Sequence, residues 1–230
     1  MKSLKKFTIL FLLFAFSLNQ AKGQAYRMEL GLQTGKSFYM GDANQSRLFW
    51  NNKPAMGILY RYNLNGRFSI KANASVFGIS GTTVGNATEY PGGAEVSFDR
   101  NILDAGVQFE FNFYEYGMPS FVSGSSPVSP YVFLGVGMTA YKAEKNKFCA
   151  NIPFGLGVRI KALPRLNVGC EWSFRNTFTD DLDYADYGGS FRLSDPWLAK
   201  SASNKNKDWY SALMLSVSYD LYGIGSNCYR

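Results

Sequence analysis

The chain contains no histidine. Its absence excludes a Ser-His-Asp or Cys-His catalytic triad, and it excludes a metal site built on imidazole ligands, because each of these needs a histidine nitrogen. We therefore predict that the protein is not an enzyme, and we assign no catalytic residue and no cofactor to it.

Cysteine is scarce and odd in number, with three residues in the chain. Cys170 lies among apolar residues of a predicted strand, where it packs as a small hydrophobe. Cys149 and Cys228 should fall at opposite ends of a strand, too far apart for a disulfide bond. No disulfide framework is predicted, and Cys228 is left as a thiol that either pairs with another chain or stays unpaired.

Long apolar runs are missing after the first residues of the chain. Lys2, Lys5 and Lys6 precede an apolar run over 7–18, and small residues follow at 21–23. This pattern is typical of a secretory signal peptide, and we expect it to span 1–23. No later run reaches the length that a membrane-spanning helix needs.

A strong excess of positive charge is also missing once this leader is set aside. The formal net charge of the whole chain is +7, and the leader carries four lysines and no acid, so about +3 remains for 24–230. There is no basic tail or stripe, so nucleic acid is not a predicted partner. The remaining length suits one domain.

The sequence does have a regular alternation of apolar and polar residues. Over 152–160 the even positions are apolar, and the odd positions are proline, glycine or charged. The residues over 166–178 repeat this pattern, and a tight turn at 162–165 separates the two segments. The pattern predicts two adjacent β-strands, each with one apolar face.

Eight segments of the chain show this alternation. They are 27–38, 55–63, 67–79, 103–113, 131–141, 151–161, 166–178 and 209–219. Their length is what a tilted strand needs to cross a bilayer, and an even number of strands matches bacterial barrels. We predict an all-β fold, an eight-stranded antiparallel transmembrane up-and-down β-barrel of the small OmpA-like kind. A soluble sandwich or lipocalin-like barrel would place the apolar face inward instead, and alternation alone does not distinguish the two.

The connections between the segments predict an orientation in the outer membrane, with lipid around the barrel and both termini in the periplasm. The connections at 42–54, 81–99, 142–150 and 179–208 are then extracellular, and those at 63–66 and 162–165 are short periplasmic turns. The periplasmic connection at 115–130 is too long for a turn. It is either a tolerated insertion or, together with the tail after residue 220, a docking surface for a periplasmic partner. The candidate contact residues are Tyr116, Met118, Phe121, Cys228, Tyr229 and Arg230.

Charged residues occur on the polar face of several strands. Because buried charges need partners, we expect an interior network that fills the barrel, and an ion path is the alternative. Its predicted members are Asp104, Glu110, Arg159, Lys161, Glu171 and Arg175. The acidic residues at 180, 181 and 183 lack the spacing of a calcium loop, so we interpret them as a solvated loop, and no metal site or small-molecule substrate is predicted.

Five stretches of the chain form a distinctive set of motifs. They are the first strand with Gly41 and Asp42 at its end, Ile-Pro-Phe-Gly-Leu-Gly-Val-Arg at 152–159, Glu-Trp-Ser-Phe-Arg-Asn-Thr-Phe-Thr-Asp-Asp-Leu-Asp at 171–183, Asp-Trp-Tyr at 208–210, and the Cys-Tyr-Arg ending. Together these stretches resemble the PorG family of small outer-membrane barrels. The run over 171–183 is the most specific of these. One departure is the end of the last strand, Tyr-Asp-Leu-Tyr-Gly at 219–223, where a more basic run is expected.

The resemblance implies a non-enzymatic barrel of the type IX secretion system. Such a barrel associates at its periplasmic side with the ring formed by the PorK lipoprotein and PorN, and helps to anchor that ring to the outer membrane. The alternative function is that of a general small barrel acting as a narrow channel or as a surface adhesin, which the interior charges and the long connection at 179–208 would suit.

Overall fold

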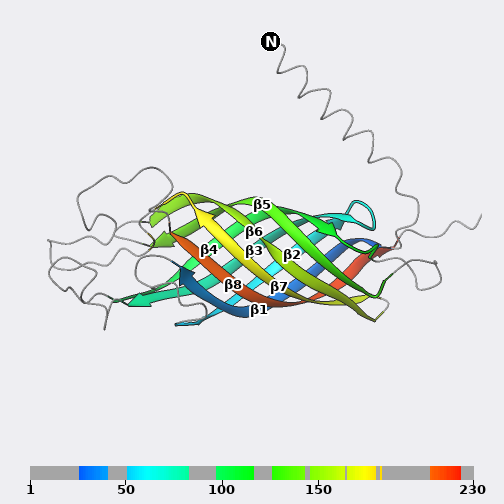
Figure 1. Cartoon of the computed structure of the whole chain (residues 1–230), viewed down its shortest axis with the longest axis horizontal. Coiled ribbons are helices and arrows are strands. Elements are labelled where there is room, and N and C mark those ends of the chain that lie inside the picture. The colour runs from blue at the N-terminus through cyan, green and yellow to red at the C-terminus, as the bar shows by residue number, and fades with distance from the viewer. Residues whose placement is uncertain are drawn as a thin grey trace, which may run out of the picture.

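The computed structural model describes residues 26–40, 51–82, 97–116, 126–142, 146–163, 165–179, 182 and 208–223. These residues form eight strands: β1 (Tyr26–Met40), β2 (Lys53–Asn63), β3 (Phe68–Thr82), β4 (Ser97–Asn112), β5 (Val128–Lys142), β6 (Asn146–Leu163), β7 (Leu166–Thr177) and β8 (Trp209–Gly223). Each strand pairs antiparallel with the next, and β8 pairs with β1 to close the barrel (Figure 1). The prediction of an all-β, eight-stranded up-and-down barrel is confirmed.

Three predicted connections are shorter than expected. β4 begins at Ser97, β5 at Val128 and β6 at Asn146, so the predicted connections at 81–99, 115–130 and 142–150 were wrong in extent. In β4 the reason is that Phe98 and Ile102 are apolar and point inward, which breaks the rule of polar residues on the inner face. Alternation therefore identified only the part of β4 that is polar inside.

The two ends of the barrel differ in what they carry. Tyr26 pairs with Gly223 and Met40 pairs with Trp209, so β1 begins where β8 ends. We call this end the terminus end and the opposite one the loop end. The strands cross the long axis of the barrel at a tilt (Figure 1), as closure of a small barrel requires.

A belt of large apolar side chains covers the outer wall, and every strand contributes to it. Leu32 is 67% exposed and Val136 is 70% exposed. Other members, one from each remaining strand, are Ile58, Val76, Leu103, Leu156, Val168 and Leu215. Soluble monomers rarely expose a continuous apolar surface of this kind. The barrel thus has its apolar side chains outside and its charged side chains inside.

The lumen at the loop end is filled by an apolar cluster. Its members are Tyr39, Ala55, Phe77, Ile79, Phe98, Ile102, Tyr141, Leu182, Tyr210, Ala212 and Met214. Leu182 enters this cluster from beyond β7, and its backbone N–H donates to Asp208 Oδ2 at 2.8 Å. The lumen is therefore polar over part of its length only, and an apolar cluster fills it at the loop end.

Glycines on the inner face of β6 make room for aromatic rings of β5. Gly157 pairs with Tyr131 and Gly155 pairs with Phe133. A Cβ atom at Gly157 would lie 2.5 Å from the Tyr131 ring, and one at Gly155 would lie 2.8 Å from the Phe133 ring. The two rings therefore lie directly against the backbone of β6, and they supply the inner-face surface that these glycines lack.

Candidate functional site

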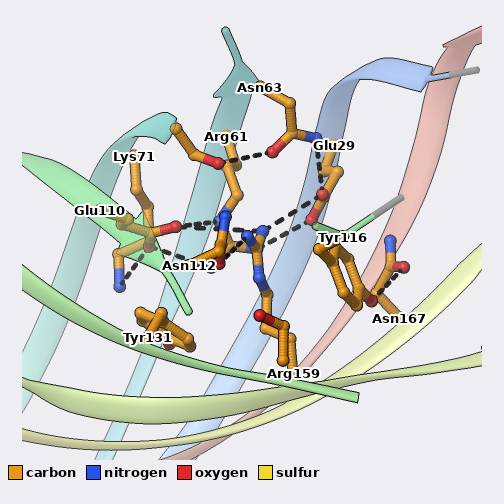
Figure 2. A network of polar contacts seen from close by, with 12 residues as sticks. Glu29, Arg61, Asn63, Lys71, Glu110, Asn112, Tyr116, Tyr131, Arg159 and Asn167 are labelled. Atoms are coloured by element: carbon orange, nitrogen blue, oxygen red, sulfur yellow. Dashed lines mark hydrogen bonds and ion pairs between the residues drawn. The ribbon is translucent and has the colours of Figure 1, made fainter. Parts of the chain in front are cut away.

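Six charged side chains meet in the lumen between the terminus end and the middle of the barrel. We call them the central network: Glu29, Arg61, Lys71, Glu110, Arg159 and Glu171. They come from six different strands, and Figure 2 shows five of them converging on one another. Each of the six points into the lumen, and its neighbours along the strand point outward, because successive side chains of a strand point to opposite faces.

Arg61 is the centre of this network. Its Nε and Nη2 atoms donate to Glu110 at 2.8 and 3.2 Å, and its Nη1 atom donates to Glu29 at 2.8 Å. The planar guanidinium suits this arrangement, since it offers several N–H groups in fixed directions. Arg61 thus joins two carboxylates that lie on β1 and β4, on either side of its own strand.

Arg159 reaches the same two carboxylates from the opposite wall. Its Nη1 atom lies 3.4 Å from Glu29 Oε1 and 3.9 Å from Glu110 Oε2. Its Nη2 atom donates to Asn112 Oδ1 at 2.7 Å. The two arginines therefore share two carboxylates, which limits their mutual repulsion.

Lys71 links the network to a third carboxylate. Its ammonium contacts Glu171 directly and lies 3.6 Å from Glu110 Oε1. Glu171 also accepts a hydrogen bond of 2.7 Å from the Tyr131 hydroxyl. The contact between Lys71 and Glu171 crosses the lumen and joins residues 100 positions apart in the chain.

The central network is electrically balanced. It contains three carboxylates and three cations, and none of the six residues is more than 7% exposed. Burial of charge is unfavourable unless each charge is paired and hydrogen-bonded, and the contacts above provide such partners. The arrangement fills this level of the lumen, and it offers no nucleophile paired with a base for chemistry.

The residues that the sequence predicted as one interior network lie in three groups. Glu110, Arg159 and Glu171 belong to the central network. Asp104 and Arg175 form a separate pair nearer the loop end, with Arg175 Nε 3.1 Å from Asp104 Oδ1. Hydrogen bonds from Asn151 Nδ2 at 2.6 Å and the Tyr210 hydroxyl at 2.8 Å complete the surroundings of Asp104.

The remaining predicted member, Lys161, lies at the terminus end. Its ammonium contacts Asp220 Oδ2 at 2.5 Å, and Asn167 Nδ2 donates to Asp220 Oδ1 at 2.8 Å. Lys161 on β6 and Asp220 on β8 therefore form an ion pair that reaches across β7.

Sequence reasoning did not include Glu29, Arg61 and Lys71 in the network. Each occupies an inner position by the alternation of its own strand, so that signal could have found them. Their meeting also depends on the register of neighbouring strands, in which Arg61 faces both Glu29 and Lys71.

Tyr116, a candidate partner contact, lies instead in the mouth of the lumen at the terminus end. Its side chain is 3% exposed, and its hydroxyl donates to Asn167 Oδ1 at 2.7 Å (Figure 2). The Arg159 guanidinium lies 4.5 Å from its ring centre. Burial raises the pKa of the Tyr116 hydroxyl. The Tyr116 side chain therefore anchors the segment that follows β4 to the lumen. It is not exposed to a partner at the surface, so the prediction of Tyr116 as a contact residue is corrected.

The other candidate contacts, Met118, Phe121, Cys228, Tyr229 and Arg230, lie outside the described residues. So do the predicted signal peptide and the acidic residues at 180, 181 and 183. Of the cysteines that the structure describes, Cys149 and Cys170 are both free, and Cys170 is exposed on the outer wall.

The described residues include no group of three or more Cys, Asp or Glu side chains arranged to hold a metal ion. No helix in this part of the chain is both long and apolar enough to span a membrane.

Comparison with known families assigns the chain to one of them. A family model described as "Domain of unknown function (DUF6089)" matches residues 4–229. The chain belongs to the DUF6089 family. No curated protein matches this DUF6089 member in sequence.

Solved structures with a similar shape are small outer-membrane proteins. Neisserial surface protein A is 11% identical, with a TM-score of 0.47 over 84% of this chain and 97% of its own. OprG from Pseudomonas aeruginosa is 11% identical, with a TM-score of 0.46 over 88% of this chain and 100% of its own. Ail from Yersinia pestis is 13% identical, with a TM-score of 0.42 over 85% of this chain and 98% of its own.

Proposed function

We propose that this protein is a non-enzymatic outer-membrane β-barrel that anchors a periplasmic assembly, and that the assembly is the ring of a type IX secretion system. The observation that carries the membrane assignment is the reversed barrel, with an apolar belt outside and paired charges inside. The anchoring role and the identity of the assembly are supported by the resemblance of the sequence to the PorG family.

The reversed barrel favours a place in a membrane. In hydrocarbon every backbone N–H and C=O group needs a partner, and a closed barrel provides one for each strand residue. The apolar belt removes its side chains from water when lipid surrounds it, at about 25 cal/mol per Å² of apolar surface. In water the same belt would promote aggregation.

The packed lumen favours a structural role over a channel. Arg61 is 2% exposed and Glu110 is 0% exposed, so water scarcely reaches the middle of the network. The apolar cluster around Phe77 and Leu182 then fills the lumen at the loop end. Ion passage would require breaking buried ion pairs, each of which is costly to break.

The terminus end provides a fixed base for a docking segment. The backbone N–H of Ser126 donates to the Glu115 carbonyl at 3.2 Å, and that of Tyr116 donates to the Gly66 carbonyl at 2.9 Å. Lys161 N–H donates to the Pro127 carbonyl at 2.8 Å. Both ends of the 117–125 segment are thus tied to the barrel, and this segment carries the apolar Met118 and Phe121.

In this proposal both termini and the 117–125 segment face the periplasm, and the partner is a PorK/PorN-like ring protein. The described residues that border the 117–125 segment and the tail after residue 223 lie at the terminus end, because β8 ends there beside the start of β1 and Tyr116 and Pro127 bond to the barrel there. The two segments would form one contact surface, separate from the lipid-facing belt.

The first experiment tests whether the protein is located in the outer membrane. The mature protein should fractionate with outer membranes and migrate faster on gels before boiling than after it. Recovery of the protein in the soluble periplasmic fraction would overturn the proposal as a whole.

The second experiment tests the partner. A variant in which Met118 and Phe121 are both replaced by serine should fold normally and lose most of the ring proteins that co-purify with the wild-type barrel in detergent. A matched control replaces Tyr187, in the connection at the loop end, by serine and should retain them. If the wild-type barrel is recovered without ring proteins, the secretion role fails while the membrane assignment stands.

The alternative function, a narrow channel or an adhesin, makes different predictions. Planar bilayers that contain the barrel should stay silent if the lumen is filled as described, and steady single-channel conductance would favour the channel. Loss of surface binding on trimming the connection at 179–208 would favour the adhesin.

A further inference from the structure

Two strands extend past their neighbours at the loop end. The pairing of β2 with β3 ends at Ala55 and Phe77, and the pairing of β4 with β5 ends at Ile102 and Tyr141. β3 and β4 remain paired with each other as far as Thr82 and Ser97. We call residues 78–82 and 97–101 the projecting ribbon, whose β3 tip reaches beyond the rest of the barrel in Figure 1.

A polar cavity of about 520 Å³ lies beside this ribbon, next to the start of β2. Its walls are Asn51, Asn52, Lys53, Ser80, Gly81, Thr82, Ser97, Phe98 and Asp99. The volume falls within the range of small-molecule sites, which is roughly 300–1,000 Å³. Asn51 and Asn52 precede β2, and the other wall residues belong to β2, β3 and β4, so the sheet holds most of the cavity wall.

The walls offer both donors and acceptors of hydrogen bonds. Asn51 and Asn52 carry amides, and Ser80, Thr82 and Ser97 carry hydroxyls, each of which can donate and accept. The Ser80 hydroxyl donates to the Asn51 carbonyl at 3.1 Å and fixes one corner. Asn51 has a φ of 50°, a left-handed conformation that asparagine tolerates better than most residues. Such walls favour a ligand rich in hydroxyl groups over an apolar one.

The charges in the cavity cancel. The ammonium of Lys53 contacts the carboxylate of Asp99 directly, and they are the charged side chains among the residues that line the cavity. A bound anion or cation would have to compete with this pair, whereas a neutral ligand can use the free N–H groups of Lys53 and the remaining lone pairs of Asp99. Phe98, 7% exposed, also lines the cavity.

We propose that this cavity is a binding site for a neutral saccharide. Sugar hydroxyls each donate and accept hydrogen bonds, and the cavity provides both kinds of group in a setting whose two charges form an ion pair with each other. The site lies at the opposite end of the barrel from the segments proposed to dock the periplasmic ring, so it does not depend on that function.

The test uses the full mature barrel, folded in detergent micelles and checked for heat-modifiable migration. The probes are maltotriose, cellotriose and chitotriose as neutral trisaccharides and tri-galacturonate as an anionic one. Saturation-transfer NMR should detect binding of at least one neutral probe at concentrations up to about 10 mM, and weaker binding of the anionic probe.

Two variants locate the site, and a third serves as the control. Asp99→Ala and Asn52→Ala should each weaken binding about tenfold or more, because each removes a hydrogen-bonding group from the wall. Asn101→Ala, an exposed asparagine of the same ribbon outside the cavity, should bind as the wild type does. The proposal is overturned if no neutral probe binds, if tri-galacturonate binds more tightly, or if the two cavity variants bind as well as the control.

Discussion

Replacement of Arg61 by methionine tests whether the central network holds the barrel together. Methionine keeps an unbranched apolar side chain but removes the charge and three hydrogen bonds, of 2.8, 2.8 and 3.2 Å. The balanced set of three carboxylates and three cations then has a net charge of −1, and Glu29 and Glu110 lose their main partner. Removal of one partner from a buried ion pair costs about 3–5 kcal/mol. We expect Arg61→Met to lower the free energy of unfolding by about 4 kcal/mol.

The measurement is equilibrium unfolding in urea with phospholipid vesicles, followed by tryptophan fluorescence and by heat-modifiable migration. A second substitution, Glu110→Gln, restores neutrality in the Arg61→Met background and should recover about 1–3 kcal/mol, a typical coupling between residues in contact. Asp99→Asn breaks the solvent-exposed pair with Lys53 and should change stability by less than about 1 kcal/mol. A loss of less than about 1 kcal/mol for Arg61→Met, or no recovery in the double variant, would refute this account of the network.

Three further predictions follow from the wall and the lumen. Both nitrogen and oxygen of the Gln108 side chain are buried without a hydrogen bond in the described structure, so Gln108→Met should leave the urea midpoint unchanged or raise it; a clear fall would show that the amide is satisfied. Gly157→Ala should lower the free energy of unfolding by about 1–3 kcal/mol, because the new Cβ would meet the Tyr131 ring. The loss should be smaller in a Tyr131→Leu background, and an equal loss in both backgrounds would exclude this contact as the cause. Val136→Lys on the outer belt should destabilise the barrel in lipid by about 2–4 kcal/mol, whereas Leu163→Lys near the terminus end should destabilise it by about 0–1 kcal/mol. Equal losses of stability in the two variants would count against burial of the belt in lipid.

The sequence was sufficient for the strand number and for the direction of most side chains. Alternation over residues such as Leu103, Val107 and Phe109 has a period of two, and that period survives in a strand whatever its neighbours are. It was insufficient at the start of β4, where the alternation is inverted: Phe98 and Ile102 are apolar and point inward, and the outward positions at 97, 99 and 101 are polar.

The sequence was also insufficient for the pairing of charges. Asp104 and Glu110 lie six residues apart on the same face, about 20 Å along the strand, so they meet different partners. Alternation places both side chains inside the barrel but does not say which residues of other strands lie at the level of each. The contact between Lys71 and Glu171 depends on the cumulative register of the strands between them. Local sequence does not encode that sum.

The contacts of the central network also bear on how the barrel assembles. Glu29, Arg61, Lys71 and Glu110 lie on β1 to β4 and carry two charges of each sign, and Arg159 and Glu171 on β6 and β7 carry one of each. The network charges within each portion therefore already cancel before the two portions meet. The contacts Lys71–Glu171 and Arg159–Glu29 form only when the sheet curls and its first and last strands join. Correct closure is thus linked to the removal of unpaired charge from the interior, so a barrel that closes in the wrong register pays an electrostatic penalty at the last step of its folding.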